Sequence, residues 1–130
     1  MSVMGIKVAE IPGKGRGVIA AKPFEIGDIL ERAPVIVLGM SDTEKIVDTI
    51  LLFYHYCWGA ESTVIACGYG SLYNHSIEPN AVYHKNLETN ELIFVAIRQI
   101  AAGDEITVNY NGDPEDKTPI IFEGNGWYKS

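Results

Sequence analysis

Short apolar stretches separated by glycine and proline dominate the chain, and this pattern predicts a protein built mainly from strands. The predicted extended segments are residues 6–11, 18–21, 29–38, 83–87, 91–97 and 105–110. The fourth and fifth are predicted to form a hairpin across Glu88-Thr89-Asn90. Pro34 predicts an edge or a break in the third segment, because proline cannot donate a ladder hydrogen bond.

One part of the chain, residues 41–59, has helical rather than strand periodicity. Ser41 and Glu44 have the spacing of a capping box, in which each side chain satisfies a backbone N–H group. Five residues then fall on one helical face: Ile46, Val47, Ile50, Leu51 and Tyr54. The pattern therefore predicts one main helix, beginning near Ser41 and ending at Gly59.

Length and composition predict a single globular domain. The chain has 130 residues, of which 47% are hydrophobic and 21% charged. It contains no stretch of the ~20 apolar residues that a membrane span needs. Met1–Lys7 shows no signal-peptide pattern. We therefore expect a cytoplasmic protein with no membrane partner, or a nuclear one if the source is eukaryotic or viral.

Charge and cysteine content narrow the classes of partner. Ten basic and seventeen acidic residues give a net charge of −7, which argues against a nucleic-acid partner because phosphate binding needs a basic patch. An acidic surface would attract a basic peptide, although acidity also serves solubility alone. Cys57 and Cys67 form no Cys-x-x-Cys pair, so no zinc site is predicted.

Three polar islands stand out from the core-forming residues. The first is Gly13-Lys14-Gly15-Arg16-Gly17. Glycine lets a backbone approach a ligand closely, and the two basic residues could hold a carboxylate. The segment lacks the ending of a phosphate loop, and a plain turn is the alternative interpretation.

The second island runs from Gly68 to Asn80. His75, His84 and Glu78 do not have the spacing of a metal site, and adjacent His75 and Ser76 do not form a hydrolase pair. An Asn-His pair in a loop suits recognition of an adenine edge, but the segment by itself also fits an ordinary polar loop.

The third island, residues 103–110, is a turn feeding a strand that ends in Tyr110. Its hydroxyl could face a pocket. A core tyrosine at the end of an amphipathic strand is the alternative.

Together and in this order, the islands resemble the SET-domain family of protein lysine methyltransferases. The resemblance is carried by an early Gly-x-Gly, by Asn-His-Ser-x-x-Pro-Asn at residues 74–80 and by Gly-Asp-Glu-Ile-Thr-x-x-Tyr at residues 103–110. It covers about residues 6–110, within one domain spanning 1–130, and residues 111–130 are predicted to form an irregular tail. The absence of a cysteine cluster in that tail makes the chain similar to the minimal SET proteins of bacteria and viruses.

The resemblance implies a mainly β fold and an activity. SET domains consist of small curled sheets of the β-clip type, with a pseudoknot-like threading of the C-terminal segment, which here would accompany one main helix. The implied reaction moves a methyl group from S-adenosylmethionine to the side-chain amine of a lysine in a protein substrate. A non-catalytic SET-like module that binds the cofactor or a lysine-containing peptide is the alternative, and a structural β-protein is a third interpretation. A homodimer is a candidate assembly, since a small domain buries a modest share of its surface.

The resemblance also implies roles for individual residues. Lys14, Gly15, Arg16 and Gly17 match the segment holding the methionine end of the cofactor. Asn74 and His75 match the pair that contacts it further along, with His75 near the adenine. Tyr110 matches the tyrosine at the methyl-transfer site, and Tyr83 and Tyr54 are expected to line the lysine channel, with Tyr56 nearly as good a match as Tyr54.

Several positions depart from the family pattern. Ser71 stands where many members have arginine, Ile77 where many have cysteine, and the usual tyrosine motif is missing at residues 33–38. With no zinc module, another group must cover the adenine, and Phe122, Trp127 and Tyr128 are candidates by position and ring size. A tether for the tail or a subunit contact is the alternative role of these rings.

Overall fold

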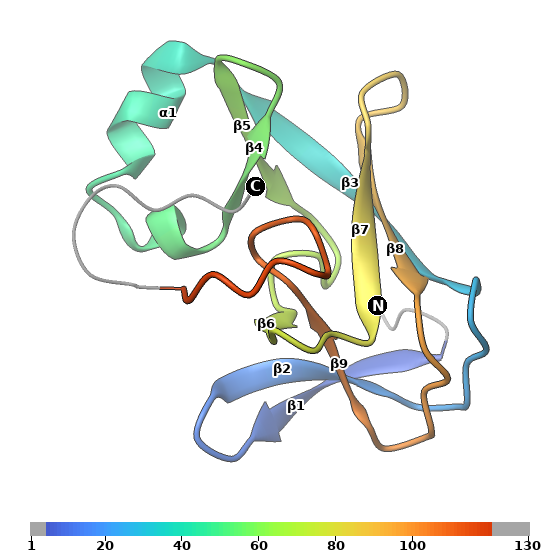
Figure 1. Cartoon of the computed structure of the whole chain (residues 1–130). Coiled ribbons are helices and arrows are strands. Elements are labelled where there is room, and N and C mark those ends of the chain that lie inside the picture. The colour runs from blue at the N-terminus through green and yellow to red at the C-terminus, as the bar shows by residue number, and fades with distance from the viewer. Residues whose placement is uncertain (1–4, 121–130) are drawn as a thin grey trace.

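The structure, a computed structural model, describes residues 5–120 and contains two small curled β-sheets (Figure 1). The strands are β1 (Ile6–Ile11), β2 (Gly15–Ala20), β3 (Ile29–Leu38), β4 (His55–Trp58), β5 (Ser62–Ala66), β6 (Asn74–His75), β7 (Ala81–Asn86), β8 (Glu91–Ala96) and β9 (Glu105–Val108). Helix α1 (Met40–Ile46) and a 3₁₀ helix (Ile50–Phe53) connect β3 to β4.

The smaller sheet has the strand order β1-β2-β9-β6. A tight turn makes β1 and β2 a hairpin, and β9 pairs with β2 in antiparallel fashion. The short strand β6 then runs parallel to β9, with Asn74 opposite Thr107 and His75 opposite Val108. This parallel pairing places the second polar island beside the third, as the resemblance implies.

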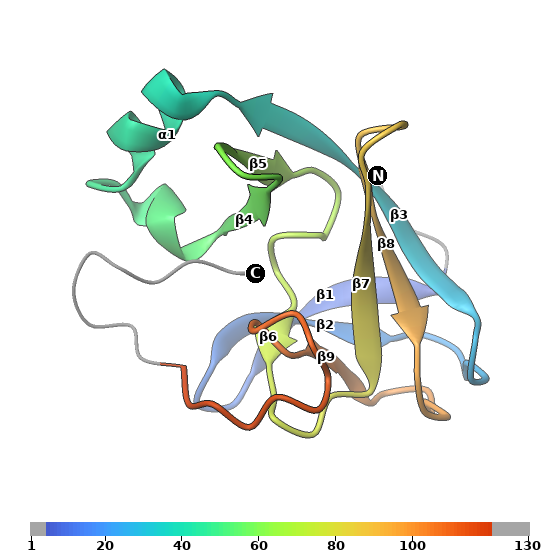
Figure 2. The ribbon, with the colours of Figure 1, turned by 45° about the horizontal axis from the view of Figure 1, so that its top comes forward.

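The larger sheet has the order β4-β5-β3-β8-β7, so β3 is its central strand and not an edge. Strand β3 pairs first with β8, ending at Pro34 opposite Glu91, and then with β5, beginning at Val35 opposite Ala66. Pro34 therefore lies where β3 changes partner, and Figure 2 shows β3 passing from the side of β8 to that of β5. Of the two predicted alternatives, the edge is wrong because β3 is central, whereas the pairing does break at Pro34, where β3 changes from one neighbour to the other.

The curl of this sheet brings its two edge strands face to face. Tyr56 on β4 packs edge-on against Tyr83 on β7, with ring centroids 5.0 Å apart. Tyr73 stacks on Phe94 at 4.2 Å in the same core. The largest side chains that are fully buried belong to strands of both sheets and to the segments between them, so one core serves both sheets.

The predicted helix over residues 41–59 is wrong in its extent. Helix α1 ends at Ile46, its N-cap is Gly39 without a side-chain capping bond, and the Ser41–Glu44 capping box is not formed. The Thr49 hydroxyl accepts the N–H group of Leu51 and starts a separate 3₁₀ turn, because threonine competes for backbone hydrogen bonds in this way. The aromatic and β-branched residues that follow favour strands, and they form the β4–β5 hairpin.

The predicted fold class, mainly β with small curled sheets, is confirmed by the nine strands within the described residues. Within residues 5–120, no helix combines the length and the apolar character needed to cross a bilayer.

Candidate functional site

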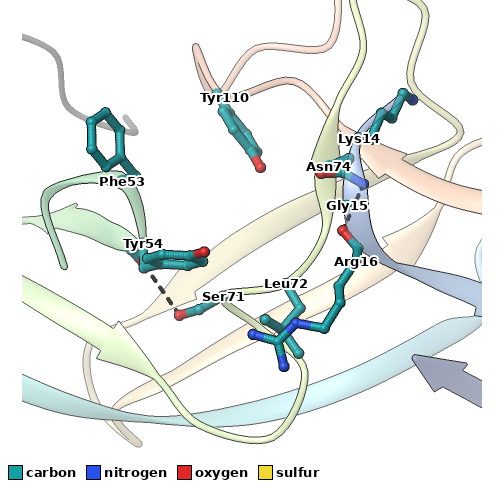
Figure 3. A pocket seen from close by; sticks show the side chains of 9 residues that line it. All are labelled: Lys14, Gly15, Arg16, Phe53, Tyr54, Ser71, Leu72, Asn74 and Tyr110. Carbon is teal, nitrogen blue, oxygen red and sulfur yellow. Dashed lines mark hydrogen bonds between the residues drawn. The ribbon is translucent and has the colours of Figure 1, made fainter. Parts of the chain in front are cut away.

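A cavity of about 260 Å³ lies where the β1–β2 turn, the 3₁₀ helix and the end of β9 meet (Figure 3). It is lined by Lys14, Gly15, Arg16, Phe53, Tyr54, Ser71, Leu72, Asn74 and Tyr110. The fold thus brings all three polar islands to one place. A neighbouring hollow of about 370 Å³ shares Lys14, Asn74 and Tyr110 and adds His75 and Ile120. His75 therefore lies beside the main cavity and not in its wall.

The glycines of the first island serve two different needs. Gly13 and Gly15 have φ values of +78°, which side chains rarely adopt, and they form the tight β1–β2 turn. Gly17 is required because the Asn74 and Glu105 side chains lie too close to its backbone to leave room for a Cβ atom. A Cβ atom there would lie 2.6 Å from Asn74 Nδ2 and 2.8 Å from Glu105 Oε2. The island is both a hairpin turn and part of the cavity wall.

We predict that Gly17→Ala lowers the unfolding free energy by about 1–3 kcal/mol, because the methyl group forces the Asn74 amide and the Glu105 carboxylate apart. Urea denaturation measures the loss. Gly39→Ala is the matched control, because Gly39 has an ordinary φ of −71° and open space at its Cβ. Equal stability of the Gly17→Ala and Gly39→Ala variants would contradict the close packing at Gly17.

Glu105 is the residue that holds the first two islands together, and sequence reasoning missed it. One carboxylate oxygen accepts from Lys14 Nζ at 2.8 Å and the other from Asn74 Nδ2 at 2.8 Å. The Asn74 amide also donates to the Arg16 carbonyl at 3.1 Å. In addition, Asn80 Nδ2 donates to the Glu105 carbonyl at 2.8 Å. Its position within the third island was the available signal, since an acidic residue there faces the basic turn of the first.

The two basic residues of the first island have different electrostatic partners. Lys14 is paired with Glu105, and in Figure 3 its side chain points away from the cavity. Arg16 forms no ion pair within residues 5–120. Figure 3 shows its guanidinium on the side of the cavity where Ser71 and Leu72 lie. Arg16 is therefore the cation that can meet an anionic group in the cavity.

His75 is a structural acceptor in its neutral form. Its Nδ1 atom accepts the backbone N–H group of Tyr110 at 3.0 Å, which fixes the proton on Nε2. Burial, and to a smaller extent the charge of Lys14, lowers its pKa below the ordinary value. Protonation of Nδ1 would remove the acceptor and release the chain at Tyr110.

We predict a loss of stability on acidification that depends on His75. A pKa lower in the folded than in the unfolded state means that the stabilisation is complete above pH 6.5 and is lost as the pH falls below that value toward the folded pKa. Urea denaturation between pH 7.5 and 5 should show the loss in the wild type and a smaller one in His75→Asn, whose Oδ1 accepts without titrating there. His84→Asn, at an exposed position of β7, should behave as the wild type. The same slope in His75→Asn and the wild type would contradict the assignment.

Tyr110 and Tyr54 face each other across the cavity (Figure 3). The Tyr110 phenol is buried and donates to the Tyr73 carbonyl. Burial first, and then the neighbouring Tyr54 and Glu105, raise the pKa of Tyr110 well above its ordinary value of 10. The phenol is therefore a neutral hydrogen-bonding group at physiological pH and not a base.

Tyr83 lies outside the lining of this cavity. It is buried against Tyr56, whose hydroxyl donates to the Gly70 carbonyl at 2.6 Å. Burial raises the pKa of Tyr56 and of Tyr83, and the Tyr110 phenol adds a smaller contribution to both shifts. Tyr56, Tyr83 and Tyr110 are hereafter called the tyrosine cluster, and of these three Tyr110 lines the cavity. Of the two tyrosines that matched the channel aromatic, Tyr54 lies in the cavity wall and Tyr56 lies in this cluster.

Comparison with known proteins shows the family. The sequence model of the SET domain matches residues 15–111, and the chain belongs to the SET domain family. It is 28% identical over 106 residues to the histone-lysine N-methyltransferase, H3 lysine-37 specific, of Schizosaccharomyces pombe, covering 81% of this chain and 72% of that protein.

Two further relatives agree. N-lysine methyltransferase KMT5A of Xenopus tropicalis is 26% identical over 140 residues, and the match covers 97% of this chain but only 40% of the frog protein. A crystal structure of a candidate histone methyltransferase from Plasmodium falciparum has a TM-score of 0.68 and 29% identity, and the match covers 82% of this chain and 92% of that one. The predicted family is therefore confirmed, while the bacterial or viral subtype stays a prediction. Phe122, Trp127 and Tyr128 lie outside the described residues.

Proposed function

We propose that the protein transfers a methyl group from S-adenosylmethionine to the side-chain amine of a lysine in a protein substrate. The observation that carries the proposal is the convergence of Arg16, Asn74 and Tyr110 on one cavity. The relatives are named as histone-lysine and N-lysine methyltransferases, which supports the same enzyme class. The net charge of −7 favours a basic peptide around the lysine.

The cavity has groups suited to each end of the donor. Arg16 supplies a cation for the donor's carboxylate, a pairing that planar guanidinium groups make well. The rings of Phe53 and Tyr54 supply apolar faces that attract a cationic sulfonium. Asn74 lies in the same wall, with its amide nitrogen donating to Arg16 and Glu105. His75 lies in the adjoining hollow, where the adenine would extend. The residues present thus fit S-adenosylmethionine.

The tyrosine cluster fits the lysine. A free lysine has a pKa of ~10.4, so the neutral amine costs roughly 4–5 kcal/mol at pH 7. Buried aromatic walls lower that pKa because they disfavour the ammonium ion, and the proton leaves to solvent. The neutral phenol of Tyr110 then holds the amine in line with the activated methyl group that the donor supplies. Bound S-adenosylmethionine would supply the methyl carbon to which the amine nitrogen bonds, and its carbon–sulfur bond would break with the electron pair left on sulfur. Orientation of this kind can contribute about 7–11 kcal/mol to the rate.

The proposal is tested by donor binding and by transfer. S-adenosylmethionine at ~100 times its Kd should add about 2.7 kcal/mol to the unfolding free energy, seen as a rise in Tm. Incubation with methyl-labelled donor and a panel of basic proteins should place label on lysine. A stabilised protein that transfers no label to any protein would favour the non-catalytic binding module, and the absence of both effects would overturn the proposal.

A further inference from the structure

Glu31 is a buried carboxyl group that the proposed chemistry does not use. It is the third residue of β3, next to the core residue Leu30, and is only 5% exposed. Moving a carboxylate out of water costs several kcal/mol unless it is well hydrogen-bonded. Burial accordingly raises the pKa of Glu31, against the opposing effect of its two hydrogen bonds. Core positions of this kind are normally apolar, so the presence of a carboxyl group needs a reason.

The contacts of Glu31 show what it holds. Its Oε1 atom accepts the Tyr73 hydroxyl at 2.7 Å, and its Oε2 atom accepts the Tyr69 N–H group at 2.9 Å. Gly68, at a φ of +61°, leaves room for it, since a Cβ there would clash with Oε2. One carboxyl group thus anchors both ends of the turn formed by residues 69–73, hereafter the carbonyl turn.

Two carbonyl groups of the carbonyl turn accept hydrogen bonds from phenols of the tyrosine cluster and so orient them. The Gly70 carbonyl accepts the Tyr56 hydroxyl at 2.6 Å, and the Tyr73 carbonyl accepts the Tyr110 hydroxyl. The next residue after the turn, Asn74, begins β6 and lines the cavity. A displacement of the carbonyl turn would therefore move the acceptors of both phenols together.

We propose that Glu31 is a positioning residue for methyl transfer, fixing the carbonyl turn so that the Tyr73 carbonyl directs the Tyr110 phenol at the reacting amine. The inference rests on the proposed function. Glu31 does not line the cavity and acts through its hydrogen bonds to Tyr69 and Tyr73, the two ends of the carbonyl turn. Because small misplacements at a reacting centre can lower the rate by ~100-fold, an anchor of this kind affects turnover more than donor binding.

The test is a double-mutant cycle with Glu31→Gln and Tyr110→Phe. Glu31→Gln keeps the size and one acceptor oxygen but replaces the other by an amide donor that faces the donor group of Tyr73 or Tyr69. We expect kcat to fall by about 10-fold or more, with the KM for S-adenosylmethionine within ~2-fold. In the Tyr110→Phe background the same substitution should change kcat by less than ~2-fold, because the phenol that it orients is gone.

A second variant separates positioning from stability. Tyr73→Phe removes the hydroxyl bound to Glu31 and leaves the Tyr73 carbonyl in the chain, so it should reproduce the kcat loss and its dependence on Tyr110 even if Glu31→Gln fails to fold. Glu91→Gln, which removes a surface carboxylate paired with Arg32 at 3.0 Å, is the control and should leave kcat unchanged.

Either of two results would overturn the inference. One is a folded Glu31→Gln or Tyr73→Phe variant whose kcat lies within ~2-fold of wild type. The other is an equal loss in the wild-type and Tyr110→Phe backgrounds, which indicates a purely structural role. A wild-type protein without transfer would overturn the proposed function itself, whereas wild-type turnover with unaffected variants removes only the role of Glu31.

Discussion

Tyr110→Phe should lower kcat by about 100-fold or more while changing the Kd for S-adenosylmethionine by less than ~3-fold. Hydrogen-bonding groups that act on the transition state have effects of this size when removed. The substitution keeps the ring, which fills the cavity wall, and deletes only the hydroxyl that donates to the Tyr73 carbonyl. Affinity is preserved because the ring and the rest of the cavity wall remain.

Single-turnover transfer of labelled methyl groups and calorimetric titration of the donor measure the two quantities separately. Tyr69→Phe is the matched control: the Tyr69 side chain does not line the cavity, and its contact with Glu31 is made by its backbone N–H group. A parallel loss of affinity and turnover would assign Tyr110 to donor binding, and unchanged turnover would remove it from the reaction. A protein that binds the donor with no turnover to lose is the non-catalytic module.

Arg16→Met should weaken S-adenosylmethionine binding by about 10- to 100-fold, because hydrogen bonds to charged groups contribute ~1.5–3 kcal/mol. Lys14→Met should have a smaller effect, below about 5-fold, because Lys14 is half-exposed and already paired with Glu105. The two substitutions remove the same charge from the same turn. A difference between their Kd values therefore reflects where each side chain points and whether it is already paired with Glu105.

Decarboxylated S-adenosylmethionine completes the measurement. The wild type should bind it more weakly than the normal donor, whereas Arg16→Met should bind both alike, because the partner of the missing carboxylate is then also missing. Calorimetric titration of the wild type, Arg16→Met and Lys14→Met with both ligands gives the six Kd values. If Lys14→Met binds the two ligands alike and Arg16→Met still prefers S-adenosylmethionine, the donor's carboxylate is bound by Lys14 and not by Arg16.

Much of the fold was predictable where one periodicity was unbroken. The alternating residues of the 83–97 region predicted the β7–β8 hairpin, which the structure pairs from Ala81 with Ala96 to Asn86 with Glu91. The prediction for the region after Gly39 was wrong because the spacing of Ile46, Ile50 and Tyr54 fits one long helix as well as it fits the short helices and the strand that are observed. Ile50 is 68% exposed in the structure, so the apolar face that would have stabilised a long helix has no core to pack against.

The candidate site was predictable only through its polar islands. Gly15, Arg16, Asn74 and Tyr110 stand out because their types do not fit a core, and they do line one cavity. Phe53 and Leu72 line it as well, but they read as ordinary core residues. Glu31 and Glu105 occur within strands and resemble solvent-facing positions. The third island marked Glu105 as a candidate, but the contacts of both residues depend on pairings between distant strands.

The parallel ladder between β6 and β9 also determines when the site comes into being during folding. The backbone N–H group of Tyr110 is hydrogen-bonded to His75, 35 positions earlier. A large loop must therefore close before Tyr110 can face the other residues that line the cavity. Local hairpins form sooner than such remote pairings. The candidate site is thus expected to form late in folding, and a nascent or partly opened chain can hold most of its strands without holding the cavity.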